Sequence, residues 1–310
     1  MTHPNPGAAA SAMSVAGMVA SVDPSLAQWP AIISVQRPGP AGSAREMVDD
    51  LASMLKSRLE LWQARNKSLP DNILIYRDGV SDGQMNLVLT RELPELRKAC
   101  NDAKFQNYYK KAGPPKISIV IVGKRHHTRF YPAKKEDASK SHNCNPGTVV
   151  DRGVTQARTW EFYLQAHHCI QGTARPAHYV VILDEILRNQ KLKADQRHQH
   201  AADALEDLTH NMCHLFGRAT KAVSICPPAY YADILCERAR CYLAEHFEPD
   251  DNSSQATTTQ RLLSEYTERE FANLSQAEKD RLITEASNLR NQQQSLINIH
   301  PSLRDTMFYI

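Results

Sequence analysis

Three acidic residues stand at places where an α/β protein can carry out chemistry. Asp78 follows the apolar segment 72–77, and α/β folds bind ligands at the carboxyl ends of their strands. Glu46 begins a long amphipathic segment and has capping-box spacing with Ser43. Asp233 lies near a predicted helix start, where the helix dipole favours negative charge. Taken singly, each acid also has an ordinary structural explanation, since Asp-Gly at 78–79 is a common turn pair.

A run of basic and aromatic residues is the second candidate for chemistry. Its members are Lys104, Lys110, Lys111, Lys116, Lys124, Arg125, Arg129, Lys134 and Lys135, interleaved with Phe105, Tyr108, Tyr109, Phe130 and Tyr131. Basic groups beside aromatic rings suit a phosphate backbone, because neutralising phosphates releases counterions. A solvated face beside a strand explains the same composition equally well.

The elements that must position these residues alternate between strands and helices in the first half of the chain. Segments 14–23 and 31–36 predict two strands joined as an antiparallel hairpin. A long helix follows, since apolar residues recur at intervals of three and four between Met47 and Trp62. The pattern then predicts a buried strand at 72–77, a helix from the Ser81–Gln84 capping box to about 103, and a strand at 116–124.

The second half of the chain is more irregular. Residues 126–150 are polar and predict a long loop. After it, the sequence predicts a strand at 178–185, helices near 200–216 and 227–246, a disordered segment at 248–260 and a polar, charged helix over about 262–296. Pro227 and Pro228 suit the first turn of the second of these helices.

Composition excludes several classes of protein. The chain has 310 residues, 42% of them hydrophobic, which is enough for a core. Its mean hydropathy is −0.50, and it has no apolar run long enough for a membrane span, nor a leader typical of a signal peptide. The seven cysteines are scattered and form no C-x-x-C pair, which indicates reduced thiols. The alternative is a zinc site with ligands from the Cys213-His214 and His142-Cys144 pairs.

Five segments resemble, in order and spacing, the PIWI domain of eukaryotic Argonaute proteins: YRDGVSDGQ (76–84), VGKRHHTRFY (122–131), GTVVDRGVT (147–155), IQGTARPAHYVVI (170–182) and CPPAYYADILCERARCYL (226–243). The resemblance covers 1 to about 247 and returns in HPSLRDTMFYI at the C-terminus. It implies an α/β, ribonuclease H-like fold, a mixed sheet flanked by helices. The implied organisation is a PIWI domain at 1–247, a polar, partly disordered or helical insertion at 248–298, and the C-terminal tail of the PIWI domain at 299–310.

The resemblance also implies roles for the three acids. Asp78 matches a metal-ligating aspartate, Glu46 a glutamate that enters the site when a guide is loaded, and Asp233 a further ligand that is histidine in many relatives. The implied cofactor is Mg²⁺ or Mn²⁺, two ions of which activate water and stabilise the leaving oxygen in phosphodiester hydrolysis. Hard oxygen ligands suit such ions.

The start of the chain departs from the family pattern. MTHPNPG resembles an Asp-Val-Thr-His-Pro motif with Met1 at the valine position, which would place the first catalytic aspartate one residue before the chain begins. The strand carrying that aspartate is the central one in the family's sheet, so its two neighbours are expected to lack their hydrogen-bond partner. The chain as it stands is therefore expected not to cleave RNA. The hypothesis is that Met1 is an internal methionine of a longer Argonaute, and a slicer-dead truncated paralogue is the alternative.

The resemblance implies a surface for a guide RNA paired with a complementary target. The matching residues are Lys124, Arg125, His126, His127, Arg129, His168, Arg175, Arg218, Lys221, Ser224, Tyr230, Arg238 and Ile310. Arg125 and Arg129 could equally be surface charges, His126 and His127 packing residues, and Tyr230 a core residue. Because the family's 5′-phosphate pocket is built mostly by a neighbouring domain, this chain alone is expected to hold a guide weakly.

The implied function is small-RNA-guided RNA silencing, through RNA binding and, in a complete protein, endoribonuclease cleavage of the target. The alternative is a non-catalytic guide-binding module, or an inactive paralogue, that silences through partner proteins. The expected location is the cytoplasm, with the nucleus as alternative, and no membrane is involved. Guide class, targets and any partner-binding pocket do not follow from the sequence.

Overall fold

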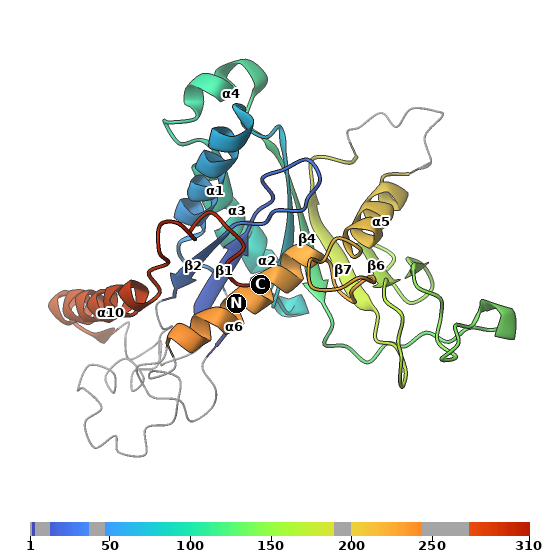
Figure 1. The fold of residues 1–310 in the computed structure, drawn as a ribbon. Coiled ribbons are helices and arrows are strands. Elements are labelled where there is room, and N and C mark those ends of the chain that lie inside the picture. The colour runs from blue at the N-terminus through green and yellow to red at the C-terminus, as the bar shows by residue number, and fades with distance from the viewer. Residues whose placement is uncertain (1, 4–12, 37–46, 189–199, 244–272) are drawn as a thin grey trace, which may run out of the picture.

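The strands of the described residues form two separate sheets, of which one has two strands and the other five. A computed structural model describes residues 2–3, 13–36, 47–188, 200–243 and 273–310. The small sheet pairs β1 (Val15–Val19) with β2 (Ala31–Val35) in antiparallel orientation. This confirms the predicted hairpin, and Figure 1 shows these blue strands set apart from β4, β7 and β6.

The larger sheet is mixed and has the order β3-β4-β7-β6-β5. Its strands are β3 (Asn72–Asp78), β4 (Lys116–Gly123), β5 (Thr148–Val150), β6 (Trp160–Gln165) and β7 (Ala177–Asp184). The β3–β4 pair is parallel, while β4–β7, β7–β6 and β6–β5 are antiparallel. The predicted fold class, a mixed sheet flanked by helices, is confirmed.

Helices cover the sheets on both faces (Figure 1). They are α1 (Leu51–Asn66), α2 (Met85–Leu87), α3 (Leu93–Cys100), α4 (Gln106–Ala112), α5 (Ala201–Met212), α6 (Pro227–Tyr242) and α10 (Gln276–Leu296). Short 3₁₀ turns at Asp82–Gln84 and Lys135–Asp137 and a π-helical stretch at Val88–Glu92 complete the helical elements described. Among the described residues, no helix is both long and apolar enough to cross a membrane.

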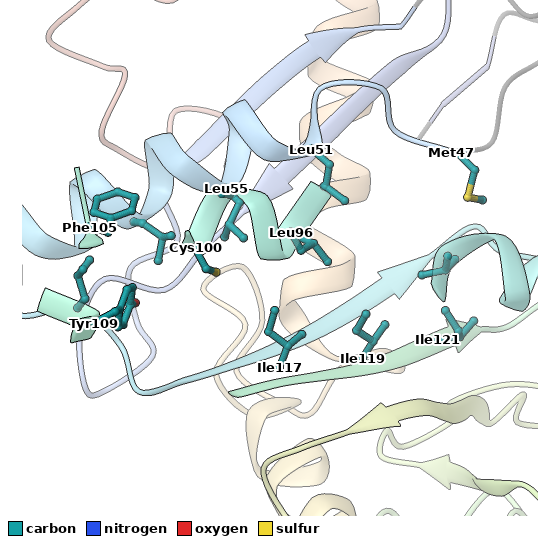
Figure 2. Packing of buried hydrophobic residues seen from close by; sticks show 14 of the residues in the cluster. Met47, Leu51, Leu55, Leu96, Cys100, Phe105, Tyr109, Ile117, Ile119 and Ile121 are labelled. Atoms are coloured by element: carbon teal, nitrogen blue, oxygen red, sulfur yellow. The ribbon is translucent and has the colours of Figure 1, made fainter. Parts of the chain in front are cut away.

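Strand β4 lies at the centre of the core because its two faces are both covered. Ile117, Ile119 and Ile121 point toward α1 and α3, where they join a cluster that contains Leu51 and Leu96 (Figure 2). The intervening Val120 and Val122 join a second cluster on the opposite face, with residues of β6, β7 and α5. Side chains of a strand alternate between its faces, so a continuous apolar run is what a strand buried on both sides requires.

Two predicted features differ from the structure. Helix α1 begins at Leu51 rather than near Ser43, and Met47 to Asp50 form a turn before it. The predicted capping box of Ser43 and Glu46 lies outside the described residues. Strand β3 is half-buried rather than buried, because one of its edges borders the cavity described below.

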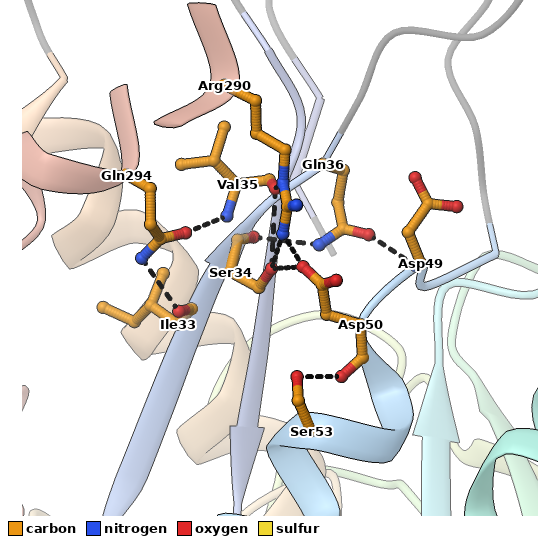
Figure 3. Close-up of polar contacts among 9 residues, drawn as sticks. All are labelled: Ile33, Ser34, Val35, Gln36, Asp49, Asp50, Ser53, Arg290 and Gln294. Carbon is orange, nitrogen blue, oxygen red and sulfur yellow. Dashed lines mark hydrogen bonds and ion pairs between the residues drawn. The ribbon is translucent and has the colours of Figure 1, made fainter. Parts of the chain in front are cut away.

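Helix α10 covers the outer edge of β2, as Figure 3 shows. The side-chain amide of Gln294 accepts a hydrogen bond from the Val35 N–H at 2.8 Å and donates one to the Ile33 carbonyl at 3.3 Å. Arg290 donates from Nε to the Val35 carbonyl at 2.7 Å and forms an ion pair with Asp50. Part of the polar segment 248–298 therefore protects a strand edge that would otherwise be open to pairing.

Candidate functional site

Asp78 and Asp233 come together from different elements. Asp78 is the last residue of β3, and Asp233 lies on α6, which contacts β3. Both carboxylates line a cavity of about 420 Å³ between β1 and β3. Burial raises the pKa of Asp78, and the negative charge of Asp233 adds to that rise, while a 2.7 Å hydrogen bond from the Gly79 N–H opposes it. The Asp233 carboxylate is therefore close enough to act on the ionisation of Asp78.

The pair offers part of a site for a hard divalent cation. Carboxylate oxygens are the ligands that Mg²⁺ prefers, usually with several waters retained. A shared cation would also relieve the repulsion between the two carboxylates. Within the described ranges, however, no group of three or more His, Cys, Asp or Glu side chains is arranged to hold a metal ion. The donor chemistry fits such an ion, and the two acids by themselves leave most of its coordination to other oxygens.

The helix-dipole explanation of Asp233 can be compared with the structure, whereas the predicted role of Glu46 cannot. Asp233 is exposed and lies in the second turn of α6, and the first turn has no acidic residue. The helix-dipole interpretation of Asp233 is therefore wrong, because that effect fades beyond the first turn. Glu46 lies outside the described residues, so its predicted role stays a prediction.

A buried ion pair supports the end of β3. Arg77 donates to Glu92 from Nε at 3.0 Å and from Nη2 at 2.9 Å, and Glu92 also accepts from the Val48 N–H at 3.0 Å. Arg77 further donates to the carbonyl of Asp78. This bidentate ion pair, called the Arg77–Glu92 fork below, holds the end of β3 that carries the Asp78 carboxylate. The sequence analysis missed Arg77 and Glu92, because their pairing joins a strand to a helical segment and has no local signature.

A second group of residues gathers just beyond the end of β4. It consists of Lys124, His167, His168, Arg175 and Ser224, called the basic cluster below. The Lys124 ammonium contacts the Ser224 hydroxyl, and burial together with the charge of Arg175 lowers the pKa of Lys124. Four of the five members were predicted from the sequence.

His167 is the member that the sequence analysis missed. Burial, followed by the charges of Lys124 and His168, lowers the pKa of His167 to about 4. Its Nδ1 is buried and has no hydrogen-bond partner among the described residues. In the sequence, His167 and His168 are adjacent, and only the fold decides which ring turns inward. A cluster rich in cations and hydroxyl donors is suited to bind an anion.

The turn after β4 holds the other predicted basic residues. His126 is half-buried, contacts the Pro176 carbonyl through Nε2 at 2.9 Å and packs against Tyr163. Burial lowers the pKa of His126, so its ring is largely a packing group at neutral pH. Arg129 donates to the carbonyls of His126 and Thr128, while Arg125 and His127 are exposed.

The remaining predicted residues lie around the start of α6 and the C-terminus. Arg218 and Lys221 are exposed in the loop before α6. The Tyr230 ring stacks on Phe216 with centroids 4.5 Å apart. This agrees with the alternative that Tyr230 is a core residue. Arg238 donates to the Phe308 carbonyl at 3.5 Å, and Ile310 is 43% exposed.

The basic and aromatic run from 104 to 135 does not form one surface. Phe105 and Tyr109 are buried in the core beside α1, and Lys104 forms an ion pair with Glu60 at 2.8 Å. Of the members of this run, Lys124 belongs to the basic cluster. For the first part of the run, packing and surface ion pairs explain the composition.

Comparison with known proteins places this arrangement in a family. A model of the Piwi domain matches residues 1–244. Protein argonaute 5 of Arabidopsis thaliana is 36% identical over 276 residues, which are 84% of this chain and 25% of that protein. Protein argonaute MEL1 of Oryza sativa subsp. japonica is 37% identical over 281 residues, 86% of this chain and 24% of that protein. The chain thus spans about a quarter of the length of these relatives.

Solved structures show the same fold. The C-terminal lobe of a budding yeast Argonaute has a TM-score of 0.71 at 27% identity, and the match covers 100% of this chain and 52% of that one. Kluyveromyces polysporus Argonaute, solved with a guide RNA, has a TM-score of 0.71 at 28% identity, with 100% and 31% covered.

Proposed function

This chain belongs to the Piwi domain family, and from that membership we propose that it binds a small guide RNA paired with its target in small-RNA-guided silencing. The basic cluster carries this proposal. It holds a partly desolvated lysine, an arginine and a serine hydroxyl in one place. Such groups bind the phosphates of an A-form duplex without reading its sequence, which leaves specificity to base pairing. We further propose a cytoplasmic location, with the nucleus as the alternative.

We propose in addition that Asp78 and Asp233 hold a divalent cation, Mg²⁺ or Mn²⁺, at the carboxyl end of β3. When bound, such a metal supplies Lewis-acid activation of water for phosphodiester hydrolysis. The chain's own contribution is to orient Asp78 through the Arg77–Glu92 fork and to place Asp233 opposite it. Calorimetric titration with Mn²⁺ tests this directly, because Asp78→Asn should remove the binding heat while leaving the circular dichroism spectrum unchanged.

The RNA proposal is tested by binding rather than by cleavage. Fluorescence anisotropy with a labelled guide–target RNA duplex at several salt concentrations gives both affinity and salt dependence. The double substitution Lys124→Gln with Arg175→Gln should weaken binding about tenfold or more, and each lost phosphate contact should reduce the salt slope by about 1.

Arg97→Gln is the matched control. Arg97 is an exposed arginine paired with Glu185, and Glu185 contacts the Ile117 N–H at the opposite end of β4 from Lys124. This variant should bind the duplex like the parent. Unchanged affinity and salt slope in the double variant would contradict the proposed role of the basic cluster.

A non-catalytic binding module is the second candidate function. The observation in its favour is that the described residues bring together two acids and not three. Duplex binding with no cleavage in Mg²⁺ or Mn²⁺ would support it. Target cleavage that disappears in Asp78→Ala would favour the nuclease instead.

A further inference from the structure

The chain between β6 and β7 carries most of the basic cluster. This stretch, residues 166–176, is called the cluster loop below, and its members of the basic cluster are His167, His168 and Arg175. Arg175 is exposed, whereas Ala174 just before it is buried. The cluster loop contains no helix or strand, so its backbone has no ladder of its own and depends on contacts with other segments.

The positive groups of the basic cluster repel one another. Burial and then the charge of Arg175 lower the pKa of Lys124, although the two residues come from different ends of the sheet's connections. Like charges held this close would separate if the backbone that carries them were free. A basic cluster that is arranged before the phosphates arrive therefore needs a restraint on the cluster loop.

The side chain of Asn143 supplies such a restraint. Asn143 is 4% exposed and lies in the neighbouring segment 138–145. Its Oδ1 accepts from the Ala174 N–H at 2.8 Å, and its Nδ2 donates to the Gly172 carbonyl at 2.9 Å. Nδ2 also donates to the Ser141 carbonyl at 3.2 Å. Both polar atoms of this buried amide are thus used, and each of them reaches the cluster loop.

The backbone around Arg175 is held from both sides. Asn143 bonds the N–H of Ala174 immediately before it, and His126 contacts the carbonyl of Pro176 immediately after it at 2.9 Å. Restraining both neighbours fixes the direction in which the Arg175 side chain leaves the backbone. The sequence analysis gave a role to His126 and none to Asn143.

We propose that Asn143 is a positioning residue for RNA binding, whose amide holds the cluster loop so that Arg175 stands beside Lys124 before the duplex arrives. The inference rests on the proposed function, because it takes the basic cluster as the phosphate-binding site. Asn143 is buried and acts through Arg175, so it is not itself a phosphate ligand. The position needs an acceptor for the Ala174 N–H and a donor for the Gly172 carbonyl, and alanine supplies neither.

Anisotropy titration of Asn143→Ala with the labelled guide–target duplex tests the proposal. The affinity should fall about fivefold or more, and the salt slope should fall by about 1, because the phosphate contact of Arg175 is lost. Asn145→Ala is the matched control. Asn145 is exposed, and its amide donates to the Asp137 carbonyl at 3.1 Å rather than to the cluster loop. This variant should bind the duplex like the parent.

A double-mutant cycle separates positioning from a general loss of stability. Asn143→Ala and Arg175→Gln should each weaken binding, and the two together should bind no more weakly than Arg175→Gln alone. A residue that only stabilises the fold would instead add its own loss of affinity. Thermal melts show which variants are folded at the temperature of the titration.

Hydrogen exchange on the parent protein gives a test that needs no variant. The amide of Ala174 should be protected without RNA, because it is bonded to Asn143 inside the folded protein. Adding the duplex should change that protection little. An Ala174 amide that becomes protected only when RNA is present would overturn the proposal, since the cluster loop would then be ordered by its ligand.

The outcomes distinguish this inference from the proposed function. If the parent does not bind the duplex, or if Lys124→Gln with Arg175→Gln binds it like the parent, both are contradicted. If that double variant binds weakly while Asn143→Ala binds like the parent, only the positioning role is overturned. Additive losses in the double-mutant cycle overturn the positioning role in the same way.

Discussion

Strands β3 and β4 are adjacent and parallel and have similar apolar sequences, yet they have different surroundings. Ile117 to Val122 of β4 are all buried, whereas Ile73 to Asp78 of β3 are half-buried. The reason is that β4 has a neighbouring strand on each side, while β3 borders the cavity between β1 and β3. Lys124 of the basic cluster directly follows β4, whereas Asp78 is the last residue of β3. The comparison teaches that Lys124 follows a strand within a complete core, whereas Asp78 ends a strand that borders a cavity.

Truncation of matched isoleucines should give the largest contrast. Ile119→Ala on β4 removes a side chain that is 1% exposed and should lower the free energy of unfolding by about 3 kcal/mol. Its register partner is Ile75 on β3, where the same change should cost about 1 kcal/mol, because that side chain is half-buried and borders a cavity. Urea denaturation measures both. Equal losses would show that β3 is as enclosed in solution as β4.

The pH dependence of His167 should give the next largest effect. Burial holds its pKa at about 4 when the protein is folded, against about 6.5 in an unfolded chain. Stability from the neutral ring is therefore present above pH 6.5 and is lost as the pH falls toward 4. Between pH 7 and pH 5 we expect a loss of about 1 kcal/mol, discounted because the ring is half-buried.

Thermal melts of His167→Gln between pH 7 and pH 5 test this. The substitution should flatten the dependence of stability on pH in that range. His127→Gln, at an exposed histidine in the turn after β4, is the matched control, and it should leave the slope in place. If the pH dependence of stability is the same in His167→Gln as in the parent, the His167 ring is solvated in the folded protein.

Asp78 should show the smallest effect, with the opposite sign. Burial raises its pKa, so its stabilising contribution is present below the pKa of the unfolded state and is lost as the pH rises through the folded value. Asp78→Asn should therefore raise the melting temperature at pH 7 and leave it unchanged at pH 3. The same change on the exposed Asp233 should matter less. A stabilisation that is equally large at pH 3 would instead point to altered packing.

Local pattern determined much of the fold. The apolar run at 116–124, the hairpin at 14–36, the Ser81–Gln84 start and the Pro227 helix start are all confirmed. Each of these elements is determined by residues within about one helical turn or one strand of it, and hydrophobic periodicity and capping are patterns of that length. The resemblance also predicted four members of the basic cluster, since their spacing along the chain is part of the pattern.

The tertiary structure decided how these pieces are exposed and paired. Only the packing shows that β3 is half-buried and that His167 Nδ1 is buried. The same holds for Arg58, whose Nε and Nη1 are buried with no hydrogen-bond partner among the described residues. The Arg77–Glu92 fork and the covering of β2 by α10 join residues far apart in sequence. Sequence periodicity records which side of an element is apolar, but burial and pairing depend on what lies against that side, and that is set by distant parts of the chain.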